Sequence, residues 1–405
     1  MKKFNKFLSV ALASAMVMAM AGCGNTDNGS AATGTNAATE SAASSDSAAS
    51  GSVFKIGGIG PTTGGAAVYG LAVQHGAEIA VEEINAAGGI NGYQVEFKFQ
   101  DDEADAEKSV NAYNALKDWG AQIIDGSTTS GACIAVTDKT KEDNMFQITP
   151  SGSAVECVQY DNNFRVCFSD PNQGLASAQY IGENGLAEKI AVIYDSSDVY
   201  SSGIYEKFAK EAENQPFEIV AAEAFTADNK TDFSVQLQKA KDAGADMVFL
   251  PIYYQESALI LTQAAAMGYA PKWFSCDGMD GILGGVDNFD VSLTEGVMLL
   301  TPFAADATDD LTQSFVTKYK EKYGETPNQF AADSYDAIYV IKAAIEKSGV
   351  TPDMSVSDIC DGMKAAMTEI TVDGLTGSGM TWTADGEANK APKAVVIENG
   401  AYKAM

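Results

Sequence analysis

The sequence predicts an α/β fold in which parallel β-sheets are covered by helices on both faces. From Val53 onward, short apolar strands alternate with longer segments of helical periodicity, and the helices end at glycines. Several strands are apolar throughout instead of alternating apolar and polar residues, which is typical of parallel strands buried on both faces. This part of the chain is long enough for two lobes.

The first strand is expected at 53–59, bounded by glycines. The helix that follows ends at Gly88-Gly89, and its apolar face carries Val73, Ala77, Val81 and Ile84. Residues 93–99 alternate apolar and polar side chains, so they are expected to form a half-buried strand.

The same strand–helix unit recurs along the chain. Helices are expected near 105–119 and 134–142, and strands at 121–125 and 145–149. Fully buried strands are expected farther on, at 190–194 and 247–250. No repeat of solenoid period is visible.

The N-terminal residues have the order of features of a bacterial export signal. Lysines at positions 2, 3 and 6 precede an uncharged run from Phe7 to Met20, which is too short for a comfortable transmembrane span. The run ends in Met20-Ala21-Gly22-Cys23, which resembles a bacterial lipobox; the alternative is an ordinary signal peptide with a cysteine nearby. We expect a signal peptide over 1–22, a lipidated Cys23, and a flexible tether over 23–52 of small and polar residues. No second apolar run of about 20 residues follows, so the rest is expected to be soluble.

Charge and cysteine content exclude several classes of function. With 55 acidic and 26 basic residues the net charge is −29, which argues against binding to nucleic acid. The six cysteines show no Cys-x-x-Cys spacing, so no zinc or other metal site is expected. Cys157 and Cys167 could form a disulfide outside the cell, or remain buried free thiols.

The sequence gives little support to an enzyme. Its single histidine, His75, lies within the first predicted helix, which argues against a Ser-His-Asp triad or a histidine-bearing metal site. Residues 58–63 depart from G-x-G-x-x-G at the last position, and Pro61 removes a backbone donor, so no dinucleotide cofactor is expected. The number of carboxylates in the sequence leaves open the alternative of a hydrolase that uses a pair of carboxylates.

In open parallel sheets, ligands bind beyond the carboxyl ends of the strands. The loops at these ends are rich in hydroxyl residues and tyrosines and hold a lone carboxylate, a set that suits a small zwitterion: 60–65, 126–131, 149–153, 194–195, 252–254 and 276–278.

Individual residues of these loops have a functional and a purely structural interpretation. Ser130, Ser151 and Ser153 are candidates for binding a carboxylate, or they only cap helices. Asp277 is the candidate counter-charge for a buried ammonium, or an ordinary turn residue before glycine. Four aromatic residues are candidates for a pocket wall or, more commonly, for the core: Tyr69, Tyr200, Tyr253 and Phe330.

Several segments match known motifs. The run 60–64, the pair Tyr69-Gly70 and the run Ile84–Gly92 (INAAGGING) resemble the leucine/isoleucine/valine-binding proteins, which are branched-chain amino-acid receptors of ABC importers with the type 1 periplasmic-binding fold. The resemblance extends over essentially all of 53–405, with further matches at 126–130, 148–150, 164–167, 170–174, 277–278, 334–337 and 375–377.

The resemblance implies two Rossmann-like lobes with parallel sheets, joined by a hinge of three crossings. By analogy the crossings fall near Ser169-Asp170, Leu300-Thr301 and Asp373-Gly374. Lobe I would then comprise 53–170 plus 301–373, and lobe II would comprise 171–300 plus 374–405.

The resemblance also implies roles for residues. Ser130 and the segment Ser151-Gly152-Ser153 would hold the ligand α-carboxylate, and Asp277 the α-ammonium. The four aromatic residues match pocket-wall positions. Asp277 replaces the longer glutamate of the best-known members, Ser153 replaces a threonine, and Ala104 and Thr129 occupy the places of a cysteine pair.

The expected function is therefore that of a solute-binding lipoprotein on the extracytoplasmic face of the cell membrane. It would deliver a small amino acid, branched-chain or similarly apolar, to an ABC permease and its ATPase. It is expected to be monomeric, to need no cofactor and to meet the membrane only through its lipid. The alternative is a receptor of the same fold for a small amide or a carboxylic or aromatic acid.

Overall fold

The computed structural model describes residues 51–405. The expected signal peptide, Cys23 and all but the last two residues of the tether lie outside the described residues. The first sheet is parallel throughout and has the strand order β2-β1-β3-β4-β5. Its strands are β1 Phe54–Gly60, β2 Val95–Asp101, β3 Ile123–Asp125, β4 Phe146–Thr149 and β5 Asn163–Arg165.

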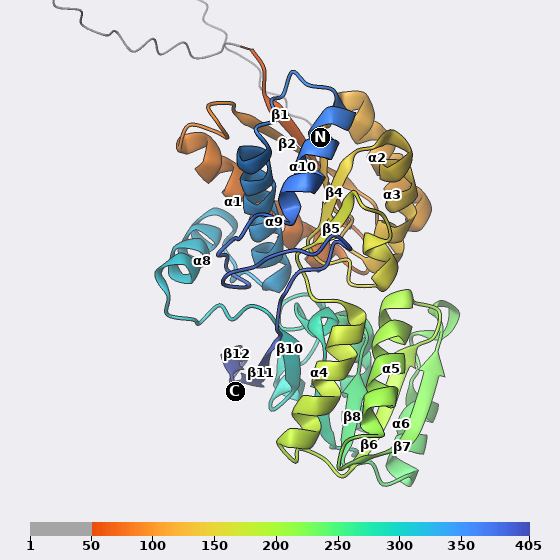
Figure 1. Cartoon of the computed structure of the whole chain (residues 1–405). Helices are drawn as coiled ribbons and strands as arrows, with labels where there is room; N and C mark the ends of the chain where they lie inside the picture. The colour runs from red at the N-terminus through yellow and green to blue at the C-terminus, as the bar shows by residue number, and fades with distance from the viewer. Residues whose placement is uncertain (1–50) are drawn as a thin grey trace, which may run out of the picture. The chain divides into compact units, whose positions relative to one another are not determined.

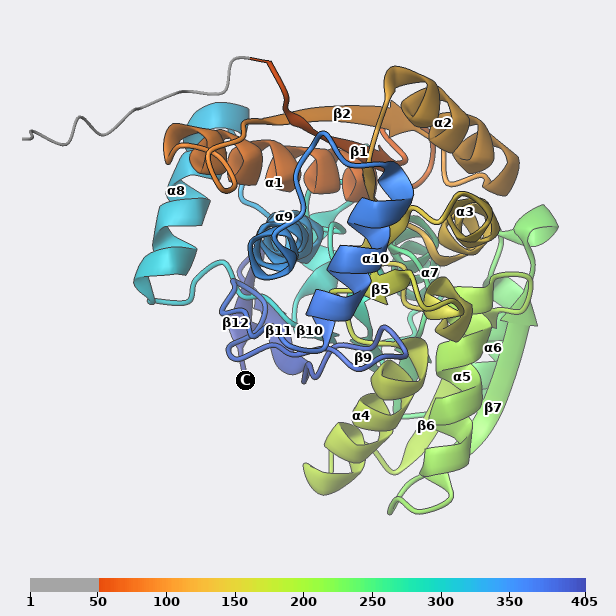
Figure 2. The same ribbon diagram turned by 45° about the horizontal axis from the view of Figure 1, so that its top comes forward.

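Helices cover both faces of this sheet, and three of them come from late in the chain (Figures 1 and 2). They are α1 Ala67–Ala86, α2 Ala106–Trp119, α3 Ser130–Asp143, α8 Asp310–Tyr323, α9 Gln329–Ser348 and α10 Val356–Met367. Consecutive residues of β3 point to opposite faces, because Ile123 packs in the cluster with α1 and α9, whereas Ile124 packs with α2 and α3. Both faces of the strand are therefore buried, as its apolar sequence predicts.

The second sheet has the order β12-β11-β10-β9-β8-β6-β7. Five strands are parallel, namely β6 Lys189–Asp195, β7 Glu218–Phe225, β8 Met247–Leu250, β9 Lys272–Ser275 and β10 Met298–Thr301. The last two, β11 Lys393–Glu398 and β12 Ala401–Ala404, are antiparallel additions at the edge. The sequence analysis did not predict this C-terminal pair.

Helices also cover both faces of the second sheet. They are α4 Asp170–Glu183, α5 Val199–Ala212, α6 Ser234–Asp242 and α7 Tyr254–Ala266. In β6, Ile190 and Val192 pack with α4 and α5, which lie side by side in both ribbon views, whereas Ala191 and Ile193 pack with α6 and α7. The two sheets with their helices form the two lobes.

The chain passes between the lobes three times (Figure 1). The first passage lies between β5 and α4, and the second between β10 and α8. The third was expected near Asp373-Gly374, but the residues that follow contact the first lobe. The N–H of Leu375 donates to Asp336 of α9 (2.8 Å), and the Lys390 ammonium pairs with Asp333 of the same helix (2.6 Å). We therefore propose that the third crossing lies after Lys390, just before β11.

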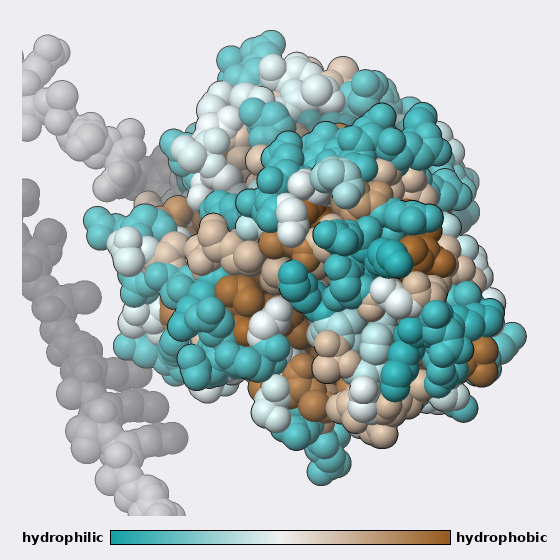
Figure 3. Space-filling view, turned by 90° about the horizontal axis from the view of Figure 1, so that it is seen from below, coloured by the Kyte–Doolittle hydropathy of each residue, from teal (hydrophilic) through white to brown (hydrophobic). Residues whose placement is uncertain are grey.

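The surface carries many charged residues and few apolar ones. Figure 3 shows one face on which hydrophilic residues surround small separate hydrophobic areas. The exposed large apolar side chains, such as Val155, Val235 and Met354, are scattered along the chain. Among residues 51–405, no helix has the length and apolarity needed to cross a membrane.

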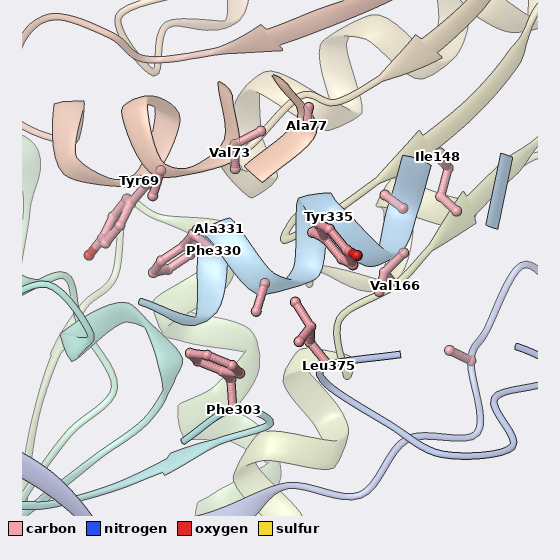
Figure 4. Packing of buried hydrophobic residues seen from close by; sticks show 14 of the residues in the cluster. Tyr69, Val73, Ala77, Ile148, Val166, Phe303, Phe330, Ala331, Tyr335 and Leu375 are labelled. Carbon is pink, nitrogen blue, oxygen red and sulfur yellow. The ribbon is translucent and has the colours of Figure 1, made fainter. Parts of the chain in front are cut away.

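Helices α1 and α9 pack closely in the core of the first lobe, where Val73 and Ala77 face the helix that bears Ala331 (Figure 4). The approach is closest at Gly76, because a Cβ added there would lie 2.0 Å from the main-chain oxygen of Ala331. Gly76 is thus required by the packing of two helices and not by its own backbone conformation.

We expect Gly76→Ala to lower the free energy of unfolding by about 1–3 kcal/mol, because the added methyl must push α1 away from α9. Gly131→Ala is the matched control, since Gly131 is also helical and nothing lies within 4 Å of its added Cβ. That variant should be unchanged or more stable by up to ~1 kcal/mol. Urea denaturation compares the two, and equal stabilities would contradict the close packing.

Candidate ligand-binding site

The residues expected to bind ligand surround one small cavity. It has about 240 Å³ of empty space, counted to the open solvent, and is lined by side chains from both lobes. Its lining contains every expected residue except Gly152, and it also contains Thr128, Thr129 and Gly278. The expected residues in the lining are Tyr69, Ser130, Ser151, Ser153, Tyr200, Tyr253, Asp277 and Phe330.

Two of the expected serines hold the loops of the cavity in place. Ser130 Oγ, at the start of α3, accepts hydrogen bonds from the N–H groups of Ser153 and Ala154, both at 3.1 Å. Ser151 Oγ donates to the main-chain oxygen of Thr128 at 2.6 Å. The hydroxyl proton of Ser151 is thus already used, whereas Ser130 keeps its proton for another acceptor.

Two other hydroxyls in the lining are free to bind a ligand. Thr129 Oγ1 and Ser153 Oγ are buried and have no hydrogen-bond partner among the described residues. Thr129 occupies the N-cap position of α3, yet its side chain makes no capping bond. Because the first N–H groups of a helix lack partners within it and carry partial positive charge, the start of α3 is suited to an anion. From the sequence, Thr129 was included in the hydroxyl-rich loop 126–131 but was not named as a ligand-binding residue; its place between a strand and a helix was the available signal.

Gly152 lies outside the cavity and has a packing role. Its N–H donates to Thr149 Oγ1 at 2.7 Å. A Cβ at this position would lie 2.8 Å from that hydroxyl and 3.0 Å from the Cβ of Cys133. We therefore propose that Gly152 shapes the loop and does not contact the ligand directly.

Arg165, which ends β5, holds the 152–155 loop from behind. It is fully buried, and its Nη1 donates to the main-chain oxygens of Gly152 (3.2 Å) and Ser153 (2.5 Å). Its Nη2 donates to those of Ala154 (2.9 Å) and Val155 (3.4 Å). Because the guanidinium draws these oxygens toward itself, the Ser153 and Ala154 N–H groups can turn toward Ser130. Sequence reasoning gave Arg165 no role beyond a family motif.

Asp277 begins the short 3₁₀ helix η3 (Asp277–Met279) directly after β9. Its side chain is buried, and Oδ1 accepts a hydrogen bond from the Tyr200 hydroxyl at 2.7 Å. Burial raises the pKa of Asp277 to about 7, and the hydrogen bond from Tyr200 opposes this shift. Among the described residues, no lysine, arginine or histidine forms a salt bridge with it. The carboxylate therefore lies in the cavity lining without a protein counter-charge.

Aromatic side chains close the cavity and join the lobes. The hydroxyl of Tyr69 on α1 donates to the main-chain oxygen of Gly278 in the second lobe and accepts from the N–H of Tyr254 at 3.1 Å. Its ring packs on that of Phe330 (Figure 4), and the two ring centroids are 4.3 Å apart. On the second lobe, the rings of Tyr200 and Tyr253 stack at 5.0 Å. The lobes are thus in direct contact around the cavity.

The cysteines and the histidine take no part in the lining. The cysteines of the described region are buried and unpaired, so Cys157 and Cys167 are free thiols. The ring of His75 stacks on that of Tyr323 with centroids 3.7 Å apart. Within residues 51–405, no group of three or more His, Cys, Asp or Glu side chains is placed to hold a metal ion.

The structure has two α/β lobes around a small cavity. The cavity has a buried carboxylate on one side and free hydroxyls near a helix start on the other. This arrangement is that of a solute-binding protein. A family model described as periplasmic binding protein matches residues 53–401. The chain belongs to the periplasmic binding protein family. The expected family and the expected fold are both confirmed.

Relatives and solved structures agree with this assignment. The chain is 31% identical over 300 residues to Leu/Ile/Val-binding protein homolog 3 of Brucella melitensis, covering 74% of this chain and 80% of that protein. It is 30% identical to the leucine-, isoleucine-, valine-, threonine- and alanine-binding protein of Pseudomonas aeruginosa, covering 73% and 78%. The structure of LivJ from Streptococcus pneumoniae in complex with isoleucine is similar, with a TM-score of 0.78, 29% identity, and coverage of 87% and 98%. A benzoate complex of a solute-binding protein from R. palustris shares the fold at a TM-score of 0.76 and 19% identity, covering 87% and 95%.

We expect Arg165→Lys to lower the free energy of unfolding by roughly 3 kcal/mol or more, because one ammonium cannot replace a guanidinium that bonds four buried oxygens. The control is Lys342→Ala, which removes an exposed ion pair with Glu346 (2.7 Å) and should cost at most about 0.5 kcal/mol. Chemical denaturation measures both variants. A cost for Arg165→Lys as small as that of the control would show that the guanidinium does not hold the loop.

Proposed function

We propose that this chain is the extracytoplasmic solute-binding lipoprotein of an ABC importer and that it captures a small amino acid, branched-chain or similarly apolar. The observation that carries the proposal is the unpaired buried carboxylate of Asp277, facing the same cavity as Thr129 and Ser153. An amino acid supplies an ammonium for the first and a carboxylate for the second. The names of the relatives, which describe branched-chain amino-acid binding, support the same ligand class.

The physical basis is that a zwitterion enclosed between two lobes loses its water. Each charge then needs a partner in the protein, since an unpaired buried charge is costly. Asp277 provides the negative partner. The hydroxyl of Thr129, that of Ser153 and the start of α3 provide hydrogen-bond donors for the carboxylate. The rings of Tyr69 and Phe330 would then cover the apolar part of the ligand.

The second candidate is a receptor for a small carboxylic or aromatic acid. The four aromatic side chains around the cavity favour it, since they offer a flat apolar surface. However, an acid without an ammonium would leave Asp277 buried beside a second anion. The amino acid is therefore the better fit.

We propose that Cys23 carries the lipid, that the tether holds the binding domain at the membrane, and that the ligand passes to a permease driven by its ATPase. The site residues have roles in binding, and we propose no catalytic role for any of them.

Asp277→Asn is expected to weaken leucine binding by about 30-fold to several thousand-fold, because a buried ammonium loses its counter-charge, a loss of ~2–5 kcal/mol. The asparagine keeps the size of the side chain and an oxygen for the Tyr200 hydroxyl. Isothermal titration calorimetry measures the affinity, and thermal unfolding of the unliganded variant serves as the folding control. N-acetyl-leucine, which has no ammonium, should not bind the wild type. Undiminished affinity in Asp277→Asn would instead support the acid receptor.

Leucine affinity is expected to be roughly tenfold weaker at pH 6 than at pH 8, because only the ionised form of Asp277 binds the ammonium and its pKa is about 7. Tyr200 and Gln173 face this carboxylate, and the nearby carboxylates of Asp333 and Asp170 disfavour its charge. Calorimetry at several pH values checks the slope. His75→Gln controls for the single histidine and should leave the profile unchanged. Equal affinities at pH 6 and pH 8 would contradict the role of Asp277.

A further inference from the structure

A second, larger cavity adjoins the amino-acid cavity. It has about 800 Å³ of empty space, counted to the open solvent, and the two cavities share Thr129 and Tyr253 in their linings. We call it the outer chamber. Its acidic end is formed by Asp195, Asp198 and Glu256, together with Lys230, and its apolar wall is formed by Val199 and Ile252.

The acidic end carries an excess of negative charge. Its three carboxylates face one ammonium, and the salt bridge that this ammonium forms is with Glu256 at 3.1 Å. Oδ1 of each aspartate accepts local hydrogen bonds. Oδ1 of Asp195 accepts from the hydroxyl (2.6 Å) and the N–H (2.8 Å) of Ser197, and Oδ1 of Asp198 accepts from the N–H of Tyr200 at 3.1 Å. None of these contacts brings in a positive charge.

These carboxylates repel one another. The pKa of Asp198 is raised to about 6, mainly by burial and also by the charges of Asp195 and Glu256, while hydrogen bonds from Tyr200 and Tyr253 oppose the shift. A cation placed among them would relieve this repulsion. The half-open chamber partly shields each charge from solvent, so the attraction is stronger than at a fully exposed site.

Thr129 lies at the junction of the two cavities, so the ligand carboxylate that we propose it binds would stand at the mouth of the outer chamber. It is 6% exposed, lines both cavities, and its Oγ1 has no hydrogen-bond partner among the described residues. A buried hydroxyl without a partner is unfavourable in a folded protein, so a ligand atom at this junction would satisfy it.

We propose that the outer chamber is a side-chain subsite for straight-chain amino acids that end in an ammonium or a guanidinium. The methylene stem would lie along Val199 and Ile252, and the cationic end would lie among Asp195, Asp198 and Glu256. This inference rests on the proposed function, because the ligand's α-ammonium and α-carboxylate occupy the inner cavity. It adds cationic amino acids to the branched-chain ones.

Calorimetry with two pairs of matched ligands tests the subsite. Ornithine and norleucine have side chains of the same length that end in an ammonium and a methyl; arginine and citrulline differ in charge at nearly the same shape. We expect the cationic member of each pair to bind at least about tenfold more tightly at moderate salt. Leucine, titrated in parallel, reports on the proposed function independently.

Variants of the acidic residues test whether the preference for a cationic ligand arises in the outer chamber. Asp198→Asn keeps a residue that caps helices well, so α5 should stay intact, and together with Asp195→Asn it should lower the ratio of ornithine to leucine affinity about tenfold. Glu183→Gln, which removes the same charge from an exposed position in the second lobe, should leave both affinities unchanged.

The outcomes separate the two claims. If leucine binds and norleucine binds at least as tightly as ornithine, the outer chamber is no cationic subsite, although the proposed function stands. A preference for ornithine that survives both aspartate substitutions would also overturn the subsite. If leucine, ornithine and arginine all fail to bind, the proposed function falls and the inference falls with it.

Discussion

The cavity depends on the buried carboxylate of Asp277. Neighbouring protein groups donate hydrogen bonds to this carboxylate but carry no positive charge that would neutralise it. The main chain of Asp277 is fixed from both lobes: its N–H donates to Gln173 of α4 at 3.2 Å, and its oxygen accepts from Gln329 of α9 at 2.9 Å. A carboxylate held in this way cannot turn out to solvent when the lobes meet. A cationic ligand group would therefore stabilise the contact between the lobes, and we propose that ligand binding and domain closure are coupled.

Arg165 plays the opposite part in the first lobe. Its guanidinium is buried, lies 3.3 Å from Glu387, and draws the main-chain oxygens of the 152–155 loop away from the cavity. Its main chain is tied to the segment before the third crossing, since its N–H donates to Gly386 and its oxygen accepts from Trp382. The loop that faces the proposed ligand carboxylate is thus connected to the hinge through one residue. The cavity lining has a carboxylate on one side and hydroxyl groups at the start of α3 and in the 152–155 loop on the other, which would give a zwitterion a single favourable orientation.

Strand and helix alternation was sufficient to predict the parallel layers, because apolar strands such as Met247–Leu250 must be buried on both faces. The rule that ligands bind at the carboxyl ends of strands also led to Asp277 and the serine loops. Hydrogen-bond partners could not be predicted, because they depend on contacts between distant segments. Thus Ser151 donates to Thr128, Gly152 packs against Thr149 and Cys133, and the hydroxyls of Thr129 and Ser153 have no hydrogen-bond partner among the described residues. We propose a later third crossing than the sequence suggested, because the contacts of Leu375 and Lys390 with α9 join segments that are distant in the sequence.

A crystal structure of the chain with leucine tests the central claim most directly. The account predicts the α-ammonium within hydrogen-bond distance of the Asp277 carboxylate, and the α-carboxylate against Thr129, Ser153 and the first turn of α3. A leucine bound in the reverse orientation, or bound away from Asp277, would contradict it.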